Sequence, residues 1–156
     1  MTKPLAIFVV ALFAGAAATA FGQAGGNDGV RGRLVGGWRL VSIEQPDAAA
    51  STRKIECCGL FVFTRDGHVS VQVMQREPQA QTPATADPYS RAGYEATYGT
   101  YVIDETTHTF TIHVEGALAS ALVGRDLPRV YEFSGKQLIV RSSNPDEHWK
   151  ATWEHY

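Results

Sequence analysis

The chain has 156 residues, of which 44% are hydrophobic, 10% aromatic and 19% charged, and its formal net charge is −2. This length accommodates one domain, or at most one domain with an appendage. The near-neutral charge argues against a broad phosphate-binding surface and a nucleic-acid partner. Seven prolines and 15 glycines lie among strong apolar runs, which excludes a disordered or a collagen-like chain.

Residues 1–24 have the pattern of a secretory signal peptide. Lys3 provides a positive start, residues 5–18 are apolar and uncharged, and small residues follow at two plausible cleavage positions. The apolar run is shorter than the roughly 20 residues that a membrane-spanning helix needs. The sequence therefore predicts export to a periplasm or the medium, with no stable membrane span after signal removal. An uncleaved membrane anchor is the alternative.

The next segment, residues 25–33, is rich in glycine and shows no apolar periodicity, so we expect a flexible leader before a folded domain of residues 34–156. Both cysteines of the chain, Cys57 and Cys58, are adjacent in that domain. Neighbouring cysteines reach disulfide geometry only through a strained peptide. We expect two small strand residues, one pointing inward and one outward, with a vicinal or an intermolecular disulfide as the alternatives.

Short β-type runs separated by turn signals make up the rest of the chain. Asp66-Gly67 is the strongest hairpin signal. Residues 77–88 carry three prolines and predict a surface loop, residues 89–97 are compatible with one short helix, and residues 116–123 with a helical turn. The expected strands cover residues 37–45, 57–64, 68–76, 98–104, 108–115, 125–133, 136–142 and 148–156.

These runs predict an all-β fold. Parallel strands need long crossovers, which are missing here, so the strands are expected to be antiparallel. Nearly sequential hairpins favour a meander, and closing the meander removes its exposed edges. We therefore expect an eight-stranded antiparallel up-and-down barrel with one short helix.

Several segments, taken in order, resemble the lipocalin-like domain family of small bacterial and fungal barrels. The start Gly36-Gly37-Trp38 corresponds to the Gly-x-Trp opening of lipocalins. The resemblance implies a lipocalin-like barrel in which Trp38 has a structural role, closing one end. The matching segments are residues 34–42, 59–64, 66–72, 98–101, 113–116, and 124 with 129–133.

An eight-stranded barrel is either packed solid or wide enough for one small ligand. Arg129 alternates with apolar side chains and needs an anionic partner, which is either Glu115, through an internal salt bridge, or a ligand carboxylate. The aromatic side chains are candidates for ligand contact and equally for core filling. They are Phe61, Phe63, Tyr101, Phe110, Tyr131, Phe133, Trp149 and Trp153, and all but the two tryptophans join Arg129 as our candidate ligand-binding residues.

His113 and Glu115 are two residues apart and so share one face of their strand. If that face points inward, the carboxylate raises the pKa of the imidazole and the two form an acid–base pair for proton transfer. If it points outward, the pair is a solvated contact of little consequence. The sequence alone leaves both open.

Three functions compete. The leading hypothesis is an exported barrel that binds a small, mainly apolar or amphipathic molecule. The second is a cofactor-independent isomerase, cyclase or hydratase with His113 and Glu115 as catalytic residues. The third is an envelope interaction module that uses the loop of residues 77–88. No spacing typical of metal ligands, nucleophilic hydrolases or phosphate-binding loops occurs, so we expect no metal and no cofactor.

Overall fold

The computed structural model describes residues 29–46, 51–77 and 88–156. The predicted signal segment (1–24) and most of the proline-rich loop (77–88) lie outside the described residues.

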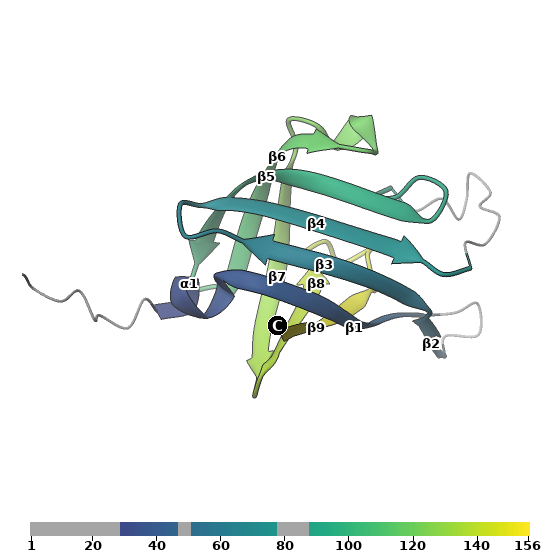
Figure 1. Cartoon of the computed structure of the whole chain (residues 1–156), viewed down its shortest axis with the longest axis horizontal. Helices are drawn as coiled ribbons and strands as arrows, with labels where there is room; N and C mark the ends of the chain where they lie inside the picture. Colours follow the sequence, from purple (N-terminus) through teal and green to yellow (C-terminus); the bar gives the residue numbers. More distant parts are fainter. Residues whose placement is uncertain (1–28, 47–50, 78–87) are drawn as a thin grey trace, which may run out of the picture.

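The described residues form a closed antiparallel barrel (Figure 1). Strands β3 to β9 follow one another in a meander, and β1 pairs with both β3 and β9, which closes the sheet into eight strands. The predicted fold class is confirmed. The elements are α1 (Gly29–Leu34), β1 (Gly36–Pro46), β2 (Thr52–Ile55), β3 (Cys57–Phe63), β4 (His68–Gln75), β5 (Tyr94–Asp104), β6 (Thr109–Ala117), the 3₁₀ turn η1 (Ser120–Leu122), β7 (Asp126–Ser134), β8 (Gln137–Ser142) and β9 (Lys150–His155).

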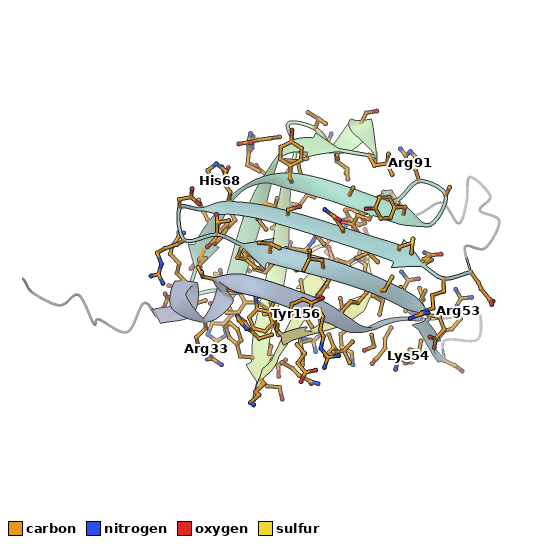
Figure 2. All side chains as sticks on the ribbon, viewed as in Figure 1. Arg33, Arg53, Lys54, His68, Arg91 and Tyr156 are labelled. Atoms are coloured by element: carbon orange, nitrogen blue, oxygen red, sulfur yellow. The ribbon has the colours of Figure 1, made fainter. Side chains whose placement is uncertain are left out.

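Strand β2 is an addition to the predicted series. It pairs with the last residues of β1 and lies outside the closed barrel. Its residues Arg53 and Lys54 are exposed, and charges of this kind discourage the pairing of an edge strand with another chain. Figure 2 shows them at the end of the molecule opposite Arg33, which belongs to α1.

The short helix lies in the predicted leader, and residues 89–97 instead lead into β5, which begins at Tyr94. Six residues are too few for a helix that is stable by itself, so tertiary contacts must hold α1. Leu34 is fully buried, and Trp38 Nε1 donates to its carbonyl oxygen over 2.7 Å. The guanidinium of Arg33 lies over the Phe133 ring, 3.8 Å from its centroid. Because residues 25–33 are rich in glycine, the sequence does not indicate that α1 forms and packs on the barrel.

The half of the barrel beside α1 is a packed aromatic core. Phe63 contacts the rings of Phe61, Tyr101 and Phe110, with centroids 4.4, 5.1 and 5.3 Å away. Tyr131 stacks on Phe110 at 6.3 Å. All five side chains are at least nine-tenths buried. This half of the interior is therefore filled by the protein's own side chains.

A bulge in β1 changes which of its side chains point inward. The register with β9 shifts between Leu40 and Ser42. Before the shift Trp38 belongs to the core, and beyond it Ile43 and Gln45 line the interior. The bulge therefore places residues of both alternation sets inside the barrel.

Candidate ligand-binding site

A cavity of about 90 Å³ lies inside the barrel, in the half away from α1. Inward-facing residues of all eight barrel strands contribute to its wall. Most of the wall is aliphatic or aromatic, as expected of a pocket for a small organic molecule. The lining residues are Ile43, Gln45, Phe61, Val71, Val73, Tyr89, Glu95, Thr97, Ile112, Leu127, Arg129, Val140, Trp149, Ala151 and Trp153.

Arg129 is the buried cation of this wall. It comes from β7 and is 7% exposed. Its guanidinium lies 4.8 Å from the ring centroid of Tyr89 and 5.2 Å from that of Trp149, and its Nη1 donates to the Pro128 carbonyl oxygen over 3.1 Å. Within the described part of the chain, no carboxylate forms an ion pair with it. Its neighbours are thus the two rings, the Tyr89 hydroxyl, with which it interacts by a side-chain hydrogen bond, and the Pro128 carbonyl, and none of them carries a negative charge.

The expected salt bridge between Arg129 and Glu115 is wrong. Arg129 points into the barrel, whereas Glu115 is exposed on the outer face of β6. The two strands are neighbours, but their side chains lie on opposite sides of the sheet.

Glu147 holds the two rings that flank Arg129. The Tyr89 hydroxyl donates to Glu147 Oε2 over 2.6 Å, and Trp149 Nε1 donates to the same oxygen over 3.2 Å. Burial raises the pKa of Tyr89 to about 12, against a smaller opposing effect of the nearby Arg129. Burial pushes the pKa of Glu147 up, but hydrogen bonds from Tyr89 and its other donors outweigh this and lower it below its ordinary value.

Two further polar side chains face the cavity without a hydrogen-bond partner. Thr97 on β5 and Trp153 on β9 are each 3% exposed, and both belong to the cavity wall. Neither Thr97 Oγ1 nor Trp153 Nε1 has a partner among the described residues. Because folded proteins satisfy the large majority of buried polar side chains, these two atoms call for an explanation.

Arg129 also borders the outside. A second hollow, of about 440 Å³, lies between η1, the start of β7 and the segment after β8. Tyr89, Leu127 and Arg129 line both this hollow and the inner cavity. These three side chains therefore separate the interior from a surface depression.

The structure distributes the predicted ligand-binding residues between two regions. Phe61 and Arg129 line the cavity. Phe63, Tyr101, Phe110 and Tyr131 belong to the packed aromatic core, and half-buried Phe133 packs under Arg33 near α1.

Sequence reasoning misses several wall residues. Thr97 lies in a segment whose pattern is also compatible with a short helix, and Gln45 faces inward because of the β1 bulge. Tyr89 precedes its strand and gives no periodic signal. Trp149 and Trp153 are among the aromatic candidates, and both line the cavity.

The condition for the His113–Glu115 acid–base pair is not met. Both side chains are exposed on the outer face of β6. His113 Nδ1 instead lies 2.9 Å from Asp126 Oδ1, and these two side chains are 59% and 69% exposed. A solvated pair of this kind lacks the apolar pocket that proton transfer within the barrel would need.

Other sequence expectations concern metals, membranes and cysteines. The described residues contain no group of three or more potential metal ligands. Within the same residues, no helix is long and apolar enough to cross a membrane. Cys57 is half-buried, Cys58 is exposed, and the two are not joined to each other by a disulfide.

The closed meander and its interior cavity define a class of protein, the small up-and-down β-barrel with an internal pocket. A family model described as a lipocalin-like domain matches residues 35–155, and the chain belongs to this family. The predicted resemblance is thereby confirmed. No curated protein matches the chain.

Two of the solved structures that match this chain come from Bacteroides species. A lipocalin-like protein from Bacteroides uniformis has a TM-score of 0.48 and 13% identity, and the match covers 80% of this chain and 99% of that one. An uncharacterized protein from Bacteroides eggerthii has a TM-score of 0.45 and 14% identity, with 79% and 99% covered.

Proposed function

We propose that the protein is an exported binding protein that holds a small, mainly apolar molecule inside its barrel. The observation that carries this proposal is the cavity itself, about 90 Å³ with a wall made largely of aliphatic and aromatic side chains. Burial of an apolar ligand against such a wall is favourable because it removes apolar surface from water. Export is part of the proposal and is supported by the signal pattern of residues 1–24.

Binding of octan-1-ol tests the proposal, since it is small, mainly apolar and uncharged. Trp149 and Trp153 line the cavity, so their fluorescence reports on its occupation, and calorimetry gives the affinity. We expect saturable binding of one molecule per chain. Native mass spectrometry of the purified protein adds a search for a molecule already bound. Absence of octan-1-ol binding by both methods would overturn the proposal.

A cavity-filling variant locates the binding. Val140 is 3% exposed and lines the cavity, so the ring of Val140→Phe occupies space that the ligand needs. Its matched control is Val102→Phe, on the outer face of β5, where the native side chain is 67% exposed. We expect octan-1-ol affinity to fall by about tenfold or more in the first variant. Equal affinity in both variants would place the binding elsewhere.

A further inference from the structure

No ion pair among the described residues compensates the charge of Arg129. A guanidinium stays protonated in proteins, and a buried charge is costly unless a counter-charge and hydrogen bonds compensate it. At 7% exposure, Arg129 has two aromatic rings, the Tyr89 hydroxyl and one backbone carbonyl as its neighbours. The rings attract a cation but supply no negative charge. Arg129 is therefore a buried cation of the cavity wall that has no ion-pair partner among the described residues.

Thr97 and Trp153 add two potential donors to the same cavity. Their Oγ1 and Nε1 atoms are buried and have no partner among the described residues. They come from β5 and β9, while Arg129 comes from β7, so three different strands direct polar groups into one space. An oxygen-bearing group on a ligand would satisfy them.

We propose that the ligand is a small amphipathic carboxylate whose carboxylate binds Arg129 while its apolar body lies against the aliphatic wall. Thr97 and Trp153 serve as hydrogen-bond donors to the oxygens of this ligand. The planar guanidinium matches a carboxylate through two parallel hydrogen bonds. The volume of the cavity, about 90 Å³, limits the ligand to a small molecule. This inference rests on the proposed function and names its ligand class.

Glu95 is the acidic side chain of the cavity wall, and a cationic ligand is the competing possibility. It is only half-buried, and it also lines a small hollow with Ser90 and Gly93. Arg129 is far more deeply buried, and its desolvated charge gains more from an opposite charge. These differences favour the anion.

Three ligands of equal chain length test the inference: octanoate, octan-1-ol and octylammonium. Calorimetry at neutral pH measures each affinity. We expect octanoate to bind at least about tenfold more tightly than octan-1-ol, because a hydrogen bond to a charged partner is worth more than a neutral one. Tighter binding of octylammonium, or equal binding of octanoate and octan-1-ol, would overturn the inference.

Variants assign the preference to Arg129. Arg129→Gln is expected to weaken octanoate about 10- to 100-fold and to change octan-1-ol by less than about threefold. Arg129→Lys keeps the charge and is expected to retain part of the preference. The matched control is Arg141→Gln on neighbouring β8, whose side chain pairs with Glu132 on the outer face. If Arg141→Gln lowered octanoate affinity as much as Arg129→Gln, the assignment would be wrong.

The donor role of Trp153 has its own variant. Trp153→Phe removes Nε1 and keeps an aromatic ring against Phe61. We expect a severalfold loss of octanoate affinity with octan-1-ol little changed, and an equal loss for both ligands would contradict the donor role.

Failure of the inference is distinguishable from failure of the proposed function. Octan-1-ol binding without an octanoate preference would support the proposed apolar site and contradict the proposed carboxylate site at Arg129. Absence of octan-1-ol binding contradicts both the proposed function and the inference, because the inference rests on the apolar site. Circular dichroism of each variant shows that lost affinity does not come from an unfolded chain.

Discussion

At the scale of single residues, the cavity wall combines groups that favour binding with groups that weaken the fold. The Thr97 hydroxyl is buried without a partner among the described residues, so the folded protein bears its desolvation cost. A valine has nearly the same shape and no hydroxyl. If Thr97 is retained for a ligand, the ligand-free protein should gain stability when the hydroxyl is removed.

We therefore expect Thr97→Val to raise the free energy of unfolding of the ligand-free protein by about 1 kcal/mol, measured by urea denaturation. The control is Thr64→Val. The Thr64 hydroxyl accepts from the His68 backbone N–H over 2.9 Å, so its removal should lower stability by about 1 kcal/mol. Equal destabilisation in both variants would mean that Thr97 has a partner in solution.

At the scale of strands, alternation and turn signals are enough to predict eight barrel strands within a few residues of their observed ends. Asp66-Gly67 does join β3 to β4. The bulge in β1 is not predictable, because it depends on the pairing with β9 and no glycine marks it in the sequence. Simple alternation from inward-facing Trp38 therefore puts Gln45 outside the barrel, whereas the bulge brings it to the cavity wall.

The bulge between β5 and β6 depends on Gly99. The register shifts between Tyr98 and Gly99, and a Cβ on Gly99 would lie 1.9 Å from the His113 carbonyl oxygen. Gly99→Ala should therefore force the two backbones apart. We expect a loss of about 3 kcal/mol or more in the free energy of unfolding.

Gly124→Ala is the control for this prediction. Gly124 has a φ of +77°, and a Cβ at this position would meet no atom within 4 Å, so only backbone strain opposes the substitution. That strain costs about 1–2 kcal/mol. Urea denaturation of both variants should rank Gly99→Ala as clearly the worse, and the reverse order would show that the bulge relaxes easily.

At the scale of the whole molecule, the barrel has a solid half beside α1 and a hollow half at the other end. The sequence shows which aromatic residues are available for the two halves but not which half each residue occupies. Alternation predicts whether a side chain points inward or outward, and it does not predict the position of that side chain along the barrel axis. Arg129 can be found from the sequence because a charge among apolar neighbours is conspicuous. The surroundings of Arg129 cannot be found from the sequence, since Tyr89 and Glu147 lie in segments without periodicity. They meet beside Arg129 only in the closed fold, and we call these three residues the Arg129 cluster.

This cluster connects three distant segments of the chain, and its titration should affect global stability. The pKa of Tyr89 is raised to about 12, whereas an exposed tyrosine titrates near 10. The unfolded chain therefore loses this proton first as pH rises. The stability that Tyr89 contributes is fully present below about pH 10 and is lost as the pH rises towards 12.

Tyr89→Phe tests this assignment, because it removes both the hydroxyl that titrates and its hydrogen bond to Glu147. Near neutral pH we expect the variant to be about 1 kcal/mol less stable than the native protein. Above about pH 10 the native protein loses its advantage, so the two urea midpoints should converge. Tyr156→Phe, at a position that is 76% exposed, should follow the native protein throughout. A constant difference between Tyr89→Phe and the native protein up to pH ~12 would mean that another group controls alkaline stability.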